Sequence, residues 1–146
     1  MTKRRGCRAI AAVEFALVVP VLLIVLIGGT DLGLKVWAKG TLANAMGQGA
    51  YYAFLAGPSV TASAVKSFVQ AAAPGTTATV SGPTAECTLS APTQLVAAPS
   101  SGNCTDGTKP GTYLTISATK TAANLGGGIW DYGGTTVSDQ VSVRLQ

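Results

Sequence analysis

The sequence predicts an α+β fold in which a long N-terminal helix, membrane-spanning in its first half, packs on a small antiparallel β-sheet domain. Three observations support this: an apolar run over 10–29, a proline-free stretch after it, and alternating apolar and polar residues nearer the C-terminus. The 146 residues suffice for one ordinary domain and an appendage. We therefore expect a basic leader at 1–9, a transmembrane helix at 10–29, an extracytoplasmic helix continuation at 30–57 and a small exported α+β domain at 58–146.

The apolar run is long enough to cross a bilayer. As a helix, residues 10–27 extend about 27 Å, close to the thickness of the hydrocarbon core. By the positive-inside rule, basic residues ahead of the run keep the N-terminus cytoplasmic and the rest exported. These residues are Lys3, Arg4, Arg5 and Arg8. A cleaved secretory signal is the rival interpretation, but Glu14 interrupts the apolar core and no convincing small-x-small cleavage site follows.

The glycines after the span predict a helix that contacts another backbone. Gly33, Gly40 and Gly47 recur every seven residues and so share one side of a helix. Each costs about 1 kcal/mol in a helix interior, so three in register suggest compensation by close packing. Gly29 and Gly33 also form a G-x-x-x-G pair at the membrane edge. The alternative is that the glycines weaken the helix and end it near Gly40.

The C-terminal part predicts one short helix and a sheet. The first helix should end near Gly57-Pro58, and Ser59 should cap an amphipathic helix that stops at Pro74-Gly75. Alternation then predicts strands in the segments TTATVSG, YLTISATK and VSDQVSVRLQ, which form an antiparallel sheet with one wet face. The face toward the helix should carry the apolar residues of the last two strands: Leu114, Ile116, Ala118, Val141, Val143 and Leu145. In the glycine-rich loop before the last strand, Trp130 and Tyr132 are either a contact tip or a plug for the small core.

Two cysteines of the exported part predict a disulfide. Cys87 and Cys104 would close a short loop in an oxidising compartment, although two free thiols are the alternative. Cys7 lies in the basic leader on the reducing side. An acylated lipoprotein cysteine is a poor fit for Cys7, because the apolar run follows it instead of preceding it.

The composition argues against catalysis and against nucleic-acid binding. The net charge of +4 comes from the four leader cations, and without them six Lys and Arg balance six Asp and Glu. There is no histidine, which excludes imidazole catalysis and histidine-ligated metal sites. The segment NLGGGIWDYGG lacks the Lys-Ser/Thr of a phosphate-binding loop. We expect no enzyme activity, no cofactor and no metal.

Glu14 is the residue of the span that calls for a function. An ionised side chain there costs roughly 3 kcal/mol on insertion scales, unless it snorkels to the interface. The layout RRGCRA followed by IAAVEFALVVPVLLIVL resembles a class 3 type IV prepilin signal. Cleavage between Ala9 and Ile10 would make Glu14 the fifth residue of the mature chain. The resemblance implies that Glu14 then faces the new N-terminal ammonium of a neighbouring subunit and sets the register of assembly.

More closely, AAVEFALVVPVLLIVLIGGTDLG resembles the TadE-like family of the tight-adherence pilus, whose Ala-Val-Glu-Phe-Ala-Leu-x-x-Pro-x-Leu-Leu pattern falls on Ala12 to Leu23 and includes Pro20. The resemblance is specific over about 4–53 and only compositional beyond. It departs from the family at Ala9, where glycine is usual; cleavage after Gly6 would put Glu14 out of register, at the eighth position.

The resemblance implies a pseudopilin or minor pilin that supports pilus biogenesis, surface adhesion and biofilm formation. It places the chain in the bacterial inner membrane as a single-pass protein, or within an extracellular pilus. Implied partners are the major pilin, other pseudopilins, the prepilin peptidase and an inner-membrane assembly platform. The alternative function is an uncleaved single-span membrane protein with an exported binding or adhesin domain.

Overall fold

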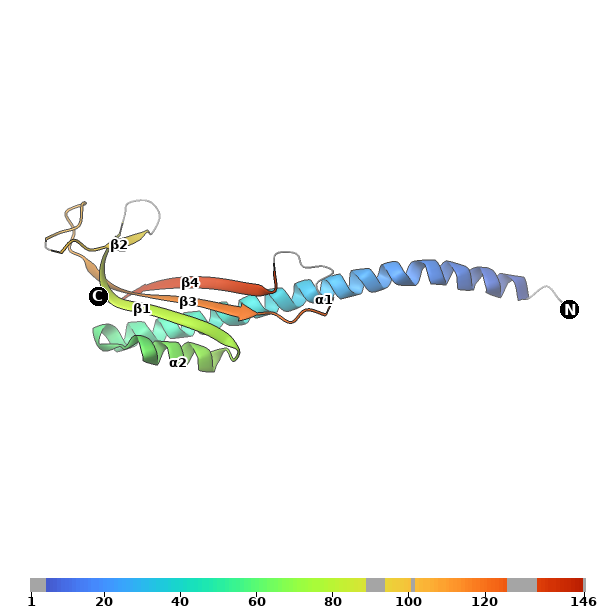
Figure 1. Ribbon diagram of the computed structural model, residues 1–146, viewed down its shortest axis with the longest axis horizontal. Helices are drawn as coiled ribbons and strands as arrows, with labels where there is room; N and C mark the ends of the chain where they lie inside the picture. Colours follow the sequence, from blue (N-terminus) through green and yellow to red (C-terminus); the bar gives the residue numbers. More distant parts are fainter. Residues whose placement is uncertain (1–4, 89–93, 101, 126–133, 146) are drawn as a thin grey trace.

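The computed structural model describes residues 5–88, 94–100, 102–125 and 134–145. One long helix carries a small domain at its C-terminal end, while its N-terminal end projects alone (Figure 1). In chain order the elements are α1 (Arg5–Ala56), the 3-10 helix η1 (Gly57–Ser59), α2 (Ala62–Ala72), β1 (Thr76–Thr88), β2 (Leu95–Ala97), β3 (Gly111–Thr121) and β4 (Thr136–Arg144). The predicted α+β fold, a long helix packed on an antiparallel sheet, is confirmed.

Helix α1 is a single element of 52 residues. It runs through Pro20 and past Gly33, Gly40 and Gly47, so the alternative in which the glycines end the helix near Gly40 is wrong. The helix stops at Ala56, where predicted. Gly57 follows with a positive φ of 64°, a conformation that glycine adopts without steric cost, and Pro58 cannot continue the hydrogen-bond ladder.

The start of α2 differs from the prediction by two residues. Ser59 does not cap this helix, because it belongs to η1 and its hydroxyl donates to the Ala56 carbonyl at 3.0 Å. The N-cap is Thr61, whose Oγ1 accepts a hydrogen bond from the Ala64 amide at 3.3 Å. Because the 3-10 turn that contains Pro58 extends to Ser59, α2 begins two residues later than predicted. Helix α2 ends at Ala72, ahead of the predicted Pro74-Gly75 stop.

The sheet has four antiparallel strands in the order β2-β1-β3-β4. Strand β1 extends six residues beyond the predicted TTATVSG segment, because a register shift between Ser81 and Thr84 accommodates Gly82 and Pro83 and the strand then resumes. Strand β2 was not predicted, since three residues are too few to show alternation. Trp130 and Tyr132 lie outside the described residues, so their two interpretations stay open.

The core lies between one face of the sheet and both helices. Leu114, Ile116 and Ala118 of β3 are buried as predicted, and Leu145 is buried beside them. Val141 and Val143 pack against the same cluster. The opposing side chains come from α1 and also from α2, whose cover was not predicted: Leu42, Ala45, Met46, Ala53, Val65 and Val69. Full burial of one such aliphatic side chain stabilises the fold by about 1.5–3 kcal/mol.

Candidate functional site

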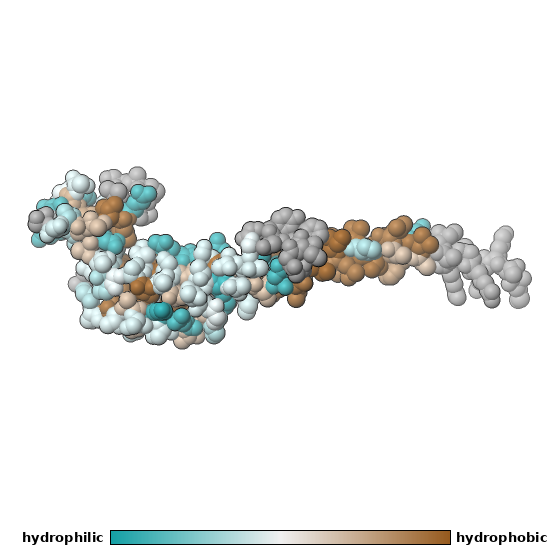
Figure 2. Space-filling view, in the orientation of Figure 1, coloured by the Kyte–Doolittle hydropathy of each residue, from teal (hydrophilic) through white to brown (hydrophobic). Residues whose placement is uncertain are grey.

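The N-terminal half of α1 is an exposed apolar rod. On the face drawn in Figure 2, apolar residues cover this part of the helix, whereas the domain is mostly pale to hydrophilic in colour. Large aliphatic and aromatic side chains on all its sides are open, with Leu17 72% exposed and Val25 65%. Over the described residues, α1 is the one helix long and apolar enough to cross a membrane, and its most apolar window is not buried at all. A helix that is apolar all round and uncovered by its own chain fits a membrane span.

Glu14 is exposed on this apolar rod, next to Val13 in the sequence and three and four residues before Leu17 and Val18. Within the described part of the chain, no ion pair or hydrogen bond engages its carboxylate. In a bilayer such a group requires a partner from outside the chain or access to the interface. The arrangement therefore leaves Glu14 available for an intermolecular cation.

The proposed cleavage residues and Pro20 all lie on the backbone of α1. Ala9 and Ile10 are consecutive residues near the start of the helix. Pro20 has no amide hydrogen, so the Ala16 carbonyl loses its usual partner four residues on. The helix nevertheless continues on both sides of Pro20, which makes it a local interruption of the hydrogen-bond ladder and not a helix end.

The predicted glycine stripe, Gly29, Gly33, Gly40 and Gly47, is open along its whole length. A Cβ added at any of the four would meet no heavy atom within 4 Å. No described part of the chain therefore makes the close backbone approach for which small residues are suited. Trp37 and Tyr51 follow Gly33 and Gly47 by four residues, so they lie on the same side, and each is 65% exposed. Apart from Lys120, whose Nζ lies 5.9 Å from the centre of the Trp37 ring, the glycines on this side of α1 are open to another molecule.

The glycine stripe leads into a groove with aromatic walls. Tyr52 of α1 stacks on Phe68 of α2, with ring centroids 5.1 Å apart and planes at 5°. The groove has a volume of about 650 Å³, and it is lined by Ala43, Asn44, Gly47, Gln48, Tyr51, Tyr52, Leu55 and Phe68. Phe54 and Leu55 are also more than half exposed. The groove extends the apolar surface of α1 beyond the span.

The glycine that the chain itself uses for close packing is Gly49, which sequence reasoning missed. It is buried on the sheet-facing side of α1, and an added Cβ would collide with Val69 Cγ2 and come within 3.7 Å of Ile116 Cδ1. Its spacing could have signalled this role. Gly49 continues the series Ala38, Leu42 and Ala45 at helical intervals, whereas Gly47 does not.

Asp31 anchors the domain at the end of the apolar run. It is 4% exposed, and its Oδ1 accepts a hydrogen bond from the Leu125 amide at 2.7 Å. In the segment that resembles the TadE-like family, Asp31 is the acidic residue after the apolar run, and the resemblance assigns it no contact within the chain. Asp31 precedes the buried residues Ala38 and Ala45 by one and two heptads. This spacing places Asp31 on the domain side of α1.

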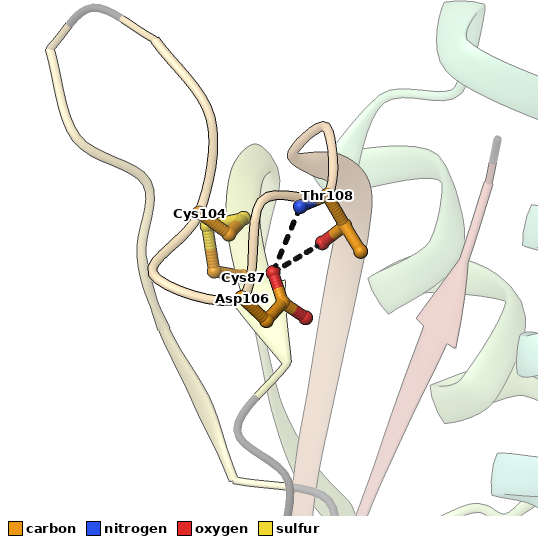
Figure 3. The surroundings of a disulfide bond; sticks show 4 residues. All are labelled: Cys87, Cys104, Asp106 and Thr108. Carbon is orange, nitrogen blue, oxygen red and sulfur yellow. Dashed lines mark hydrogen bonds between the residues drawn. A yellow bond between two sulfur atoms is a disulfide. The ribbon is translucent and has the colours of Figure 1, made fainter.

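Cys87 and Cys104 lie at disulfide distance at the end of the domain remote from the N-terminus. Their Cα atoms are 5.7 Å apart and their sulfur atoms are joined (Figure 3). Beside them, Asp106 Oδ1 accepts hydrogen bonds from the Thr108 amide and hydroxyl at 3.0 and 2.7 Å. These two donors lower the pKa of the Asp106 carboxyl. The pair and the turn together fix the loop that precedes β3.

The candidate residues thus fall into separate groups along the molecule. Glu14, Pro20 and the glycine stripe share α1, whereas the cysteine pair lies at the opposite end of the domain. In the described ranges no three histidine, cysteine or acidic side chains gather as metal ligands. The arrangement offers surfaces for association.

One comparison with known proteins gave a match, and it covers the segment that contains the candidate membrane span. Residues 9–50 match the family model described as TadE-like protein. The predicted family resemblance is confirmed over that segment. No curated protein and no solved structure matches the chain.

Proposed function

We propose that the chain is a pilin-like structural and assembly component, a pseudopilin or minor pilin, of a tight-adherence pilus. It would support pilus biogenesis, surface adhesion and biofilm formation. The observation that carries the proposal is the exposed apolar half of α1 with the single carboxylate of Glu14 upon it, in the segment that matches TadE-like proteins. Association and not catalysis is the function that such a surface supports.

The proposed location is the bacterial inner membrane, with a cytoplasmic N-terminus and an exported domain. A prepilin peptidase cuts between Ala9 and Ile10 and leaves the apolar helix in place. The freed α-ammonium of one subunit then pairs with Glu14 of its neighbour. An isolated carboxylate in hydrocarbon carries a free-energy cost, and pairing with an ammonium offsets that cost. The ion pair therefore favours the assembled state and fixes the axial register of the helices.

The glycine stripe is the proposed packing surface for neighbouring helices. Small side chains allow two helix backbones to approach closely in a membrane. Open space around Gly33, Gly40 and Gly47 supports this role, as does the aromatic groove that follows them. The proposed partners are the major pilin, other pseudopilins and the inner-membrane assembly platform.

The decisive variant is Glu14→Gln, which removes the charge and keeps the size. Membrane insertion should be unchanged or easier, and the domain, which is remote from position 14, should keep its stability. Crosslinking to pilus components and surface piliation should fall. Val13→Leu and Ala16→Leu are the matched controls, because they disturb the same helix turn without a change of charge. Assembly of Glu14→Gln at the level of the wild type would remove the main support for the proposal.

The second candidate function is an uncleaved single-span protein with an exported binding or adhesin domain. The hollows at the membrane-distal end of the sheet, lined by charged and hydroxyl side chains, favour it. Sequencing of the mature N-terminus separates the two functions. Ile10 as the first residue supports the assembly component, whereas Met1 supports the uncleaved protein.

A further inference from the structure

A polar pocket lies on the wet face of the sheet, where its wall includes both cysteines of the disulfide pair. Figure 3 shows that pair and the turn beside it. This distal pocket has a volume of about 290 Å³, and its wall includes Glu86, Cys87, Cys104, Lys109, Tyr113 and Arg144. Ligand sites commonly measure about 300–1,000 Å³. The distal pocket therefore suits one small ligand unit.

The missing side chain of Gly111 opens the pocket. In the sheet register Gly111 lies opposite Glu86 of β1, and the neighbouring Tyr113 lies opposite Arg144 of β4. A Cβ at Gly111 would come within 2.9 Å of Arg144 Nε and 2.8 Å of Tyr113 Cε2. Any larger residue would therefore displace the two side chains that form the wall.

The charges of the distal pocket suit a carboxylate-bearing ligand. The Arg144 guanidinium lies 6.0 Å from the centre of the Tyr113 ring, and among the described residues it has no acidic partner. Its planar fork matches a carboxylate, and the Lys109 ammonium adds a second cation. The Glu86 carboxylate, held by the Thr84 hydroxyl at 2.9 Å, disfavours dense polyanions and can accept hydrogen bonds from a ligand's hydroxyls.

A second hollow adjoins the distal pocket and shares Glu86 with it. This groove has a volume of about 430 Å³ beneath β2. Its polar lining is neutral apart from Glu86 and consists of Ser81, Gln94, Thr115, Gln140 and Ser142. Leu95 and Val96 supply an apolar wall. Hydroxyl and amide groups beside an apolar wall match the hydroxyls and the C–H faces of sugar rings.

We propose that the distal pocket binds the carboxylate of an acidic sugar and that the adjoining groove holds the next sugar units of the same chain. Arg144 and Lys109 receive the carboxylate, and Glu86 accepts hydrogen bonds from ring hydroxyls at the junction. The exported location proposed above would give this site access to extracellular polysaccharide. The binding itself needs neither cleavage at Ala9 nor assembly, so its test is independent of theirs.

The test is calorimetric titration of the full chain in lipid nanodiscs with a galacturonate trisaccharide. The methyl-esterified trisaccharide, which lacks only the charge, should bind about tenfold more weakly or worse. Arg144→Gln should weaken galacturonate binding to a similar extent, and Arg144→Lys should give partial binding because it keeps the charge without the fork. Gly111→Ala should weaken binding of both trisaccharides, since the new methyl group displaces the Arg144 and Tyr113 side chains while the number of charges stays the same.

Lys120→Gln is the matched control for charge. Lys120 lies at the opposite end of β3, with its Nζ 5.9 Å from the centre of the Trp37 ring, so its loss should leave binding unchanged. Equal losses in Lys120→Gln and Arg144→Gln, or no binding of galacturonate at millimolar concentration, would overturn the proposal. Competition by inorganic sulfate as strong as that of the trisaccharide would reduce the site to a general oxyanion site. Thermal unfolding of each variant separates lost binding from lost folding.

Discussion

The Asp31 carboxylate accepts the backbone hydrogen of Leu125 at 2.7 Å, across 94 residues of sequence. This contact joins the last exposed turns of the apolar helix to the segment that leaves β3. It is charge-assisted and buried on the Asp31 side, the circumstances in which a hydrogen bond contributes most. The domain is thereby fastened at both ends of its contact with α1, because the core packs against the helix from Ala38 to Ala53.

Asp31→Ala should lower the free energy of unfolding by about 1.5–3 kcal/mol, because it leaves the Leu125 amide without its charged acceptor. Asp31→Asn keeps an acceptor oxygen and should cost less. Thermal unfolding in detergent micelles measures both, and hydrogen exchange at Leu125 should accelerate in the alanine variant. Asp139→Asn is the control, since Asp139 accepts from the adjacent Gln140 amide on the edge strand. An unchanged exchange rate at Leu125 in Asp31→Ala would contradict the anchoring role.

Alanine at Gly49 and at Gly47 should have opposite effects on stability. At Gly49 the new methyl group meets Val69 Cγ2, and overpacking of about 1–3 kcal/mol should exceed the helix-propensity gain of about 1 kcal/mol. At Gly47 the space is open, so the substitution brings only the helix-propensity gain and should stabilise the protein. Val69→Ala should offset the loss in the Gly49→Ala background. Chemical denaturation of the three variants tests this, and a Gly49→Ala protein as stable as Gly47→Ala would show that the core is looser than described.

Loss of the cysteine pair should destabilise the domain by about 3 kcal/mol, as the chain-entropy model gives for a loop of this size, with a sequence separation of 17. The variant is Cys87→Ser combined with Cys104→Ser, measured by thermal unfolding without reductant. Cys7→Ser should leave the stability unchanged, because Cys7 lies at the start of α1, ahead of the apolar run. If both thiols of the wild-type protein purified from cells react freely with an alkylating reagent, the bond does not form in the cell.

The Cys104–Thr108 turn should keep its hydrogen bonds to unusually low pH. The two donors of Thr108 lower the Asp106 pKa below the ordinary aspartate value of about 3.9. Any stability from this turn is therefore present above that ordinary value and is lost as the pH falls through the lowered one. The Thr108 amide resonance should report the transition. Thr108→Val removes the hydroxyl donor and should raise the midpoint, and a midpoint that does not move would contradict the assigned cause.

Features that depend on a residue pattern within one helix or one strand could be predicted from the sequence. Alternation predicted that Leu114, Ile116 and Ala118 lie on the buried face of β3. The lack of proline between Pro20 and Pro58 predicted that α1 continues to about Ala56. Features that depend on a distant partner could not be predicted in this way. Nothing near Leu125 in the sequence identifies it as the donor to Asp31, and β2 is held in place by pairing with β1.

The glycines of α1 show the same division. Their seven-residue spacing correctly placed Gly33, Gly40 and Gly47 on one side, and this side is open. It could not tell which side of α1 lies against the sheet, because that depends on residues of α2 and β3. The packing glycine, Gly49, lies in the other series and became identifiable only with Val69 and Ile116 in view.

The unbroken length of α1 has a mechanical consequence. At about 1.5 Å per residue, its 52 residues form a rod of about 78 Å, and the domain is clamped along one side of its outer half. Between the apolar half and the domain there is no linker to stretch, because the same helix serves both. A pull on the domain is therefore transmitted axially along one continuous helix to the turns that carry Glu14. Such a part behaves as a strut, in which load reaches the apolar half of α1 without first unfolding a hinge.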